Sequence, residues 1–180
     1  MANRPPTHSA KVATVLEYAR RFDCHTLIET GTFKGHMVRG TKPWFSKIYS
    51  IELDPRLASI QRETYKDNPN ITILWGDSTD FVPVVLQWVT ERCVFWLDAH
   101  YSGGVTAKGK TNTPILEELK AILDSKLDCV ILIDDARCFT GENDYPSIDD
   151  VRDFVLLGRP DWEFEVENDI IRAHRRENQC

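Results

Sequence analysis

Acidic side chains follow five short apolar segments of this sequence, at the point where each segment ends. They are Glu29, Glu52, Asp77, Asp98 and the pair Asp134 and Asp135. Carboxylates accept hydrogen bonds, pair with cations and coordinate hard metal ions. Core packing does not require a charged group at the end of every apolar segment. These acids are therefore candidates for a ligand-binding site.

The first acid opens a glycine-containing turn, the stretch ETGTFKG at positions 29–35. Gly31 and Gly35 allow the backbone to pass close to a ligand, and Thr30 and Thr32 belong to the same turn. The carboxylate of Glu29 would repel a pyrophosphate, but it suits a ligand that carries an ammonium group. Taken alone, the turn is equally compatible with a tight strand–helix connection that binds nothing.

A second acid at a suitable spacing supports a nucleoside ligand. Glu52 lies roughly 20 residues after the turn, where doubly wound folds place the carboxylate that binds both ribose hydroxyls. Asp77 and Ser78 are placed to bind an adenine amino group, although Asp77 is also suited to cap the helix that follows it. A ligand with an ammonium group, a ribose and an adenine is S-adenosylmethionine, which we predict as the cofactor.

The elements that position these acids alternate along the chain. Continuous apolar runs such as CVFWL at 93–97 and VILI at 130–133 are typical of parallel strands covered on both faces. Five such strands alternate with amphipathic segments, a pattern that predicts a parallel sheet with helices on both sides. Two further segments, separated only by Asn168 and Asp169, predict an antiparallel hairpin at the C-terminal end.

We therefore predict one domain over residues 1–180, with a doubly wound, Rossmann-like α/β fold. Its sheet is expected to have seven strands, mostly parallel, with the antiparallel hairpin at one edge. Ligands of such sheets bind outside the carboxyl ends of the strands. All five acidic positions are thus expected at one edge of the sheet.

The motifs resemble those of class I S-adenosylmethionine-dependent methyltransferases over nearly the whole chain. IETGTFKG at 28–35 resembles the first motif of catechol-type O-methyltransferases, YSIELDP at 49–55 the second motif and WGDS at 75–78 the third. FWLDAH at 95–100 and ILIDD at 131–135 are similar to the metal-dependent O-methyltransferases, catechol-type and macrocin-type, which include enzymes that modify antibiotic sugars. The resemblance implies methyl transfer to a small-molecule hydroxyl, such as that of a sugar or polyol.

The same resemblance implies a divalent metal ion, held by Asp98, Asp134 and Asp135. Three oxygen ligands suit Mg²⁺, and the ion would lower the pKa of a substrate hydroxyl. The alternative is that the acid pair serves a structural role, by capping a turn or pairing with Arg137.

Catechol-type enzymes carry a lysine base three residues after the first metal-binding acid. Here Tyr101 holds that position, with His100 before it. Asp98, His100 and Tyr101 are accordingly the candidate catalytic residues, and the identity of the general base stays open. Cover over the substrate must come from the glycine-rich loop after Asp98, from the loop at 136–146, or from a second subunit, so a homodimer also stays open.

Composition restricts the class of ligand and the location. The chain has 180 residues and a formal net charge of −6, which argues against a nucleic-acid-binding surface and favours a small-molecule substrate. No run approaches the roughly 18 apolar residues of a membrane span. The five cysteines form no CxxC pair and are expected to be reduced thiols of a cytoplasmic protein.

Two other functions fit part of this pattern. A nicotinamide-dependent Rossmann oxidoreductase shares the alternating strands and the ribose-binding acid, but it would be expected to carry a G-x-G-x-x-G turn, which this chain lacks. A non-catalytic S-adenosylmethionine-binding module would keep the cofactor site and methylate nothing.

Overall fold

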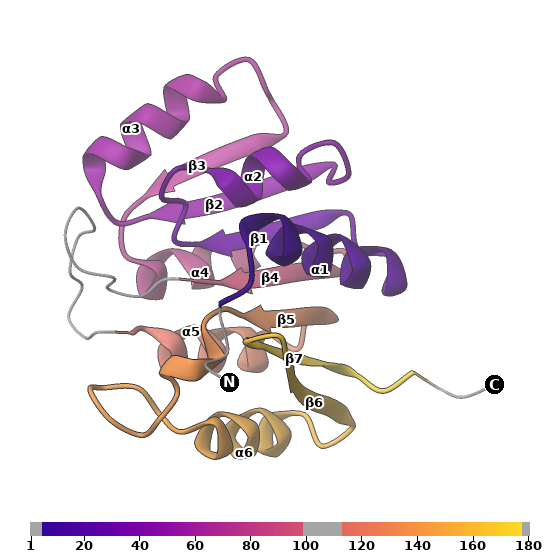
Figure 1. Cartoon of the computed structure of the whole chain (residues 1–180). Coiled ribbons are helices and arrows are strands. Elements are labelled where there is room, and N and C mark those ends of the chain that lie inside the picture. Colours follow the sequence, from indigo (N-terminus) through magenta and orange to yellow (C-terminus); the bar gives the residue numbers. More distant parts are fainter. Residues whose placement is uncertain (1–4, 99–112, 178–180) are drawn as a thin grey trace.

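The computed structural model describes residues 5–98 and 113–177, which form a seven-stranded sheet flanked by helices (Figure 1). The elements follow one another along the chain as α1 (His8–Arg21), β1 (Thr26–Thr30), α2 (His36–Thr41), β2 (Lys47–Glu52), α3 (Pro55–Thr64), β3 (Ile71–Trp75), α4 (Ser78–Leu86), β4 (Cys93–Leu97), α5 (Ile115–Ser125), β5 (Cys129–Ile133), the short 3₁₀ helix η1 (Ala136–Cys138), α6 (Ile148–Gly158), β6 (Trp162–Glu167) and β7 (Ile170–Arg175). The predicted alternation of strands and helices is confirmed.

The strand order is β3-β2-β1-β4-β5-β7-β6. Strands β1 to β5 pair in parallel, whereas β7 pairs antiparallel with both β5 and β6. The chain runs outward from β1 in one direction and then, from β4, in the other, which makes the β1–β4 boundary the switch point where ligands of such folds bind. The hairpin residues Asn168 and Asp169 have φ of 51° and 62°, as a two-residue turn of this hand requires.

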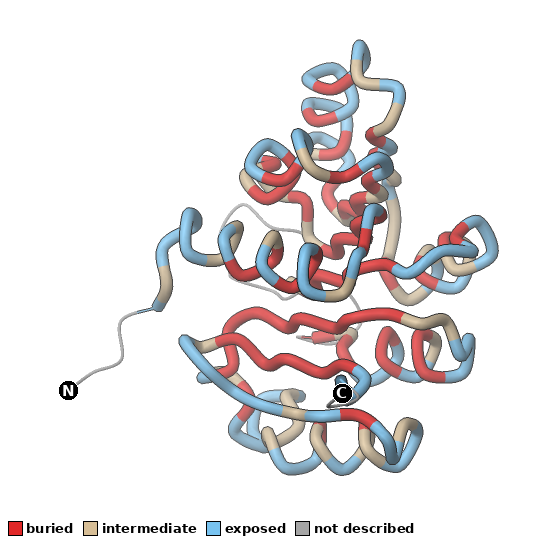
Figure 2. Tube along the Cα trace, turned by 90° about the vertical axis from the view of Figure 1, so that its right-hand side faces the viewer, coloured by how far each residue is buried: buried red, intermediate tan, exposed pale blue. Residues whose placement is uncertain are grey.

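The two faces of the sheet carry separate hydrophobic cores. Helices α1, α2 and α3 cover one face, and α4, α5 and α6 cover the other (Figure 1). Neighbouring strand residues alternate between the two cores, so that Leu27 belongs to the core beneath α1, α2 and α3 while Ile28 belongs to the opposite core. Figure 2 shows that the buried residues concentrate on the strands between these helical layers.

The helices that follow β2 and β3 begin on acidic caps. Asp54 accepts hydrogen bonds from the backbone N–H of Arg56 at 2.8 Å and of Leu57 at 3.1 Å, and Pro55 occupies the first helical position. Asp77 accepts from the N–H of Thr79 at 3.0 Å. Because both caps sit just beyond a strand, they fix the loops at the carboxyl edge of the sheet.

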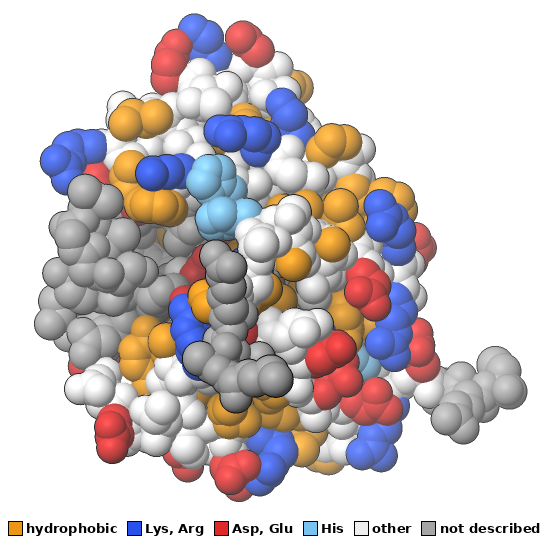
Figure 3. Space-filling model, viewed as in Figure 1, with side chains coloured by type: hydrophobic (Ala, Val, Ile, Leu, Met, Phe, Trp, Pro, Cys, Tyr) orange, Lys and Arg blue, Asp and Glu red, His pale blue; other side chains and the backbone are white. Residues whose placement is uncertain are grey.

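The surface shows no strong segregation of charge on the face drawn in Figure 3, where the basic and acidic side chains of the described residues are interspersed. Across residues 5–98 and 113–177, none of the helices has the length and hydrophobicity that crossing a bilayer requires.

Candidate functional site

Glu29 is a buried carboxyl at the end of β1. The residue is 2% exposed, and the hydroxyl of Ser50 on the neighbouring strand donates a hydrogen bond to its Oε2. Burial raises the pKa of Glu29 to about 8, with the charges of Asp98 and Glu52 acting in the same direction and the Ser50 hydrogen bond opposing them. A nearby positive charge stabilises the ionised form of a buried carboxyl, so this position favours a cationic ligand.

Glu52 organises the turn after β1 from the end of the adjacent strand β2. Its Oε2 accepts from the N–H of Phe33 at 2.7 Å, and its Oε1 accepts from the N–H of Asp54 at 2.8 Å. A carboxylate has about four lone-pair positions, so both oxygens can still accept from ligand hydroxyls. The carboxylate thus joins the turn after β1 to the loop after β2.

The turn itself depends on glycine at two positions. Gly31 and Gly35 have φ of 85° and 66°, in the region that favours glycine. At Gly35 an added Cβ would also lie 2.6 Å from Oε1 of Gln61. Thr32 turns inward, where its hydroxyl lies 2.6 Å from that of Ser50. The turn and the Glu29 carboxyl are therefore held through the same serine.

The residues expected near an adenine divide between two roles. Asp77 is the N-cap of α4, and its Oδ1 also accepts from the hydroxyl of Thr79 at 2.9 Å. Ser78 is buried at the start of the same helix. Asp77 therefore caps the helix, as the alternative interpretation of the sequence predicted. Its Oδ1 makes these contacts, which leaves Oδ2 for a ligand.

The structure brings together the three acids expected to hold a metal ion. One carboxylate oxygen from each of Asp98, Asp134 and Asp135 lies within 4.8 Å of the others. The backbone explains this convergence, because the N–H of Asp98 bonds to Thr30 O at 3.1 Å and that of Asp134 to Leu97 O at 3.0 Å. Parallel pairing therefore extends one residue beyond β4 and β5 and aligns their terminal acids.

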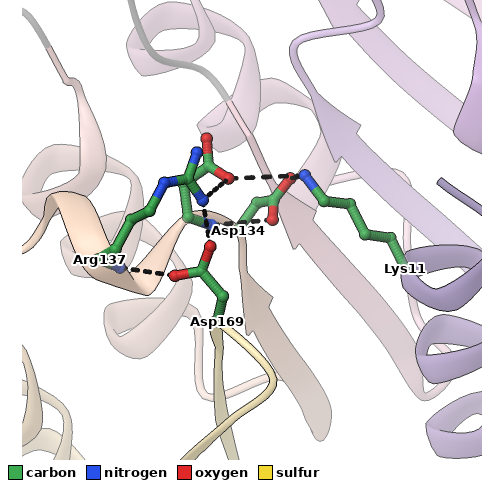
Figure 4. A network of polar contacts seen from close by, with 5 residues as sticks. Lys11, Asp134, Arg137 and Asp169 are labelled. Atoms are coloured by element: carbon green, nitrogen blue, oxygen red, sulfur yellow. Dashed lines mark hydrogen bonds and ion pairs between the residues drawn. The ribbon is translucent and has the colours of Figure 1, made fainter. Parts of the chain in front are cut away.

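Lys11 is a member of this cluster that the sequence did not suggest. It extends from the first turns of α1, and its Nζ pairs with Asp134 and lies 3.5 Å from Oδ1 of Asp135 (Figure 4). Burial lowers the pKa of Lys11, but the carboxylates of Asp134, Asp135 and Asp98 outweigh that effect and leave the pKa raised. A helix that precedes a parallel strand begins near the carboxyl edge of the sheet. The position of Lys11 in the first turns of such a helix is therefore the only feature of the sequence that could have placed it near the acids.

A second cation holds the cluster from the other side. Arg137 pairs with Oδ1 of Asp135 at 2.8 Å and with the carboxylate of Asp169 in the β6–β7 turn (Figure 4). Asp169 also accepts from the backbone N–H of Arg137 at 2.8 Å. The expected alternative of an Asp135–Arg137 pair is therefore present, and the hairpin anchors the loop that follows β5.

The three carboxylates fit a divalent ion by their chemistry, since oxygen ligands suit Mg²⁺. The ammonium group of Lys11 contacts two of the same three side chains. Lys11 would therefore have to withdraw before an ion could take its place. His100 and Tyr101, the other candidates for catalysis, lie outside the described residues.

The fold and strand order are those of class I S-adenosylmethionine-dependent methyltransferases. The chain is similar over 96% of its length to the O-methyltransferase TomG from Streptomyces achromogenes, whose structure contains S-adenosylmethionine. The TM-score is 0.67, the identity 17%, and 82% of that chain is covered.

Two further solved structures have similar folds. An O-methyltransferase from Bacillus cereus matches with a TM-score of 0.67 at 14% identity, over 98% of this chain and 84% of its own. The 23S rRNA methyltransferase ErmE matches with a TM-score of 0.61 at 20% identity, over 96% of this chain and 70% of its own. No family model and no curated protein sequence matches the chain. At these identities the similarity establishes the fold.

Proposed function

We propose that the protein transfers a methyl group from S-adenosylmethionine to a hydroxyl of a small molecule, with a sugar or polyol as the acceptor. The observation that carries the proposal is the pair of buried carboxyls Glu29 and Glu52 at the carboxyl ends of adjacent strands, on the two sides of one glycine turn. Glu29 suits the ammonium end of the cofactor, and Glu52 suits its ribose hydroxyls.

In this reaction the acceptor oxygen attacks the methyl carbon, and a carbon–oxygen bond forms as the carbon–sulfur bond breaks. The bonding electrons stay on sulfur, which becomes a neutral thioether, and the hydroxyl proton passes to a base. Asp98, His100 and Tyr101 are the proposed candidates near the acceptor. The alignment of donor and acceptor supplies much of the rate in such transfers.

A divalent ion on Asp98, Asp134 and Asp135 is part of the proposal, because their oxygens converge. When bound, such an ion lowers the pKa of a coordinated hydroxyl and so favours the attacking alkoxide. The chain's own contribution is to hold the three carboxylates in register through the extended pairing of β4 and β5.

A small acceptor is favoured over a nucleic acid by the charge of this site. Four acids line the pocket beside the proposed cofactor site, and the whole chain carries a formal charge of −6. Phosphate backbones bind through clustered lysines and arginines. The similarity to ErmE concerns the fold, and the acidic site argues for a different acceptor.

Glu52→Ala provides the direct test of cofactor binding. We expect the variant to bind S-adenosylhomocysteine at least about 100-fold more weakly, because it loses two hydroxyl contacts to a charged acceptor and the anchor of the Phe33 loop. Titration calorimetry measures the change. Glu63→Ala, which removes an exposed acid from α3, serves as the control and should bind normally.

The same titration separates the proposal from its rivals. Binding of NAD in place of S-adenosylhomocysteine would indicate the oxidoreductase. Unchanged binding in Glu52→Ala would remove the structural basis for the cofactor site.

A further inference from the structure

A pocket lies at the carboxyl ends of β4 and β5, between these strands and α5. Its polar lining includes Asp98, Asp134, Asp135 and Glu118, set among apolar side chains. The first three are the cluster already described. Glu118 is a fourth acid, contributed by a different element, and neither the metal cluster nor the proposed cofactor contacts account for it.

Glu118 is buried in an unusual way for a charged residue. The residue is 1% exposed, and its Oε1 has no hydrogen-bond partner among the described residues. It lies on the buried stripe of α5 formed by Ile115, Leu119 and Ile122. A buried carboxylate oxygen without a donor costs stability. A ligand that places positive charge beside Oε1 would therefore offset part of this cost.

The surroundings of Glu118 lie on the proposed cofactor side of the pocket. The hydroxyls of Ser78 at the start of α4 and Thr30 at the end of β1 lie close enough to its carboxyl group to act on its pKa. Within residues 5–98 and 113–177, Thr30 Oγ1 is also buried without a hydrogen-bond partner. Burial raises the pKa of Glu118 to about 7; these hydroxyls lower it, and the charges of Asp77 and Glu117 raise it. None of these groups is a cation.

Glu118 thus lies where the two halves of the site meet. Thr30 adjoins the carboxyl proposed to bind the cofactor's ammonium group, whereas Asp98 and Asp134 line the proposed acceptor side. In any methyl transfer the sulfonium must lie at this junction, because its methyl group points from the cofactor to the acceptor. A sulfonium carries a full positive charge and has no N–H to donate, which matches the buried oxygen Oε1 of Glu118, for which the described residues supply no hydrogen-bond donor.

We propose that Glu118 binds the sulfonium of S-adenosylmethionine and distinguishes this cation from the neutral thioether product. The inference rests on the proposed methyltransferase function. In a buried site the attraction between a carboxylate and a cation is weakly screened. Methyl transfer neutralises the sulfur, removes this attraction and so favours release of S-adenosylhomocysteine.

The test compares two ligands that differ in this charge. Sinefungin carries an amine-bearing carbon in place of the methylsulfonium, so its ammonium reproduces the positive charge, whereas S-adenosylhomocysteine is neutral there. Calorimetry at pH 8, where Glu118 is mostly ionised, gives the ratio of their dissociation constants. We expect the wild type to prefer sinefungin and Glu118→Gln to lose roughly tenfold or more of that preference.

Glu117→Gln is the matched control, because Glu117 is the exposed neighbour of Glu118 on the same helix and should leave the ratio unchanged. An unchanged ratio in Glu118→Gln, or equal weakening of both ligands, overturns the role of Glu118. A wild type that binds both ligands equally also overturns it, even if the variant fails to fold. A wild type that binds neither ligand overturns the proposed function itself.

Discussion

Lys11→Met is expected to destabilise the protein by about 2–4 kcal/mol at pH 8, because it removes one partner of a buried ion pair. The side chain of Asp134 is fully buried, and Lys11 is its cationic partner across the site. Burial and the charges of Asp98 and Asp135 already raise the pKa of Asp134 to about 7, and Lys11 opposes this rise. Urea unfolding of the wild type and the variant measures the difference.

The cost of this substitution should depend on pH in a defined direction. Without Lys11 the pKa of Asp134 rises further, so the folded variant takes up a proton more readily and the destabilisation shrinks towards pH 5.5. Lys47→Met, which removes an exposed lysine from β2, controls for the loss of one charge. Equal stability of Lys11→Met and the wild type at pH 8 would show that the contact contributes nothing.

Lys11→Met should also bind a divalent ion more tightly. The ammonium group of Lys11 contacts two of the three converging carboxylates, so removing it leaves their charge for the ion. Electron paramagnetic resonance with Mn²⁺ measures this affinity without any acceptor or cofactor. Weaker Mn²⁺ binding in the variant would instead make Lys11 a support of the ion site.

Much of the fold could be predicted because its determinants are local. The apolar runs of β4 and β5 fix buried parallel strands, and the two residues between β6 and β7 permit only a hairpin. The convergence of Asp98, Asp134 and Asp135 then follows from the alignment of carboxyl ends in a parallel sheet. Local sequence patterns were therefore sufficient to predict these strands, the hairpin and the convergence of the three acids.

The remaining site residues depend on contacts that local patterns do not encode. Lys11 is 123 residues from its partner Asp134, and nothing in its own helix distinguishes it from a solvated lysine. Glu118 adjoins the exposed Glu117, and two adjacent glutamates are typical of a solvent-exposed helix face. The helical spacing of Ile115 and Leu119 nevertheless places Glu118 on the buried face of α5. The burial of such charged side chains depends on contacts between distant parts of the chain, and it is therefore difficult to predict from local sequence patterns.

Glu29 should make the unliganded protein less stable as the pH rises from about 4.5 to about 8. The pKa of this carboxyl is raised from 4.5 to about 8 on folding, chiefly by burial. Between these values the folded state holds a proton that the unfolded state has lost. The stabilisation from Glu29 is therefore fully present below pH 4.5 and is lost as the pH rises through 8, by about 5 kcal/mol in all.

Glu29→Gln isolates this contribution from the other titrating groups. Glutamine keeps an oxygen that can accept from Ser50 and carries no charge to bury. We expect the variant to match the wild type near pH 5 and to be more stable by about 3–4 kcal/mol at pH 9, as measured by urea unfolding. Glu163→Gln, at an exposed position of β6, should follow the wild type throughout. If the unfolding free energies of Glu29→Gln and the wild type changed with pH in parallel, the raised pKa of Glu29 would be contradicted.

The same carboxyl links the proposed cofactor to protons. A ligand whose ammonium group lies beside Glu29 favours the ionised carboxylate, so its binding near pH 6.5 should expel up to one proton from a side chain that is protonated without it. Calorimetry in two buffers of different ionisation enthalpy counts the protons released when S-adenosylhomocysteine binds. Glu29→Gln should bind more weakly and release fewer protons than the wild type. If both proteins released the same number, Glu29 would not face the ammonium group, because a ligand cannot displace a proton from a residue whose charge it does not affect.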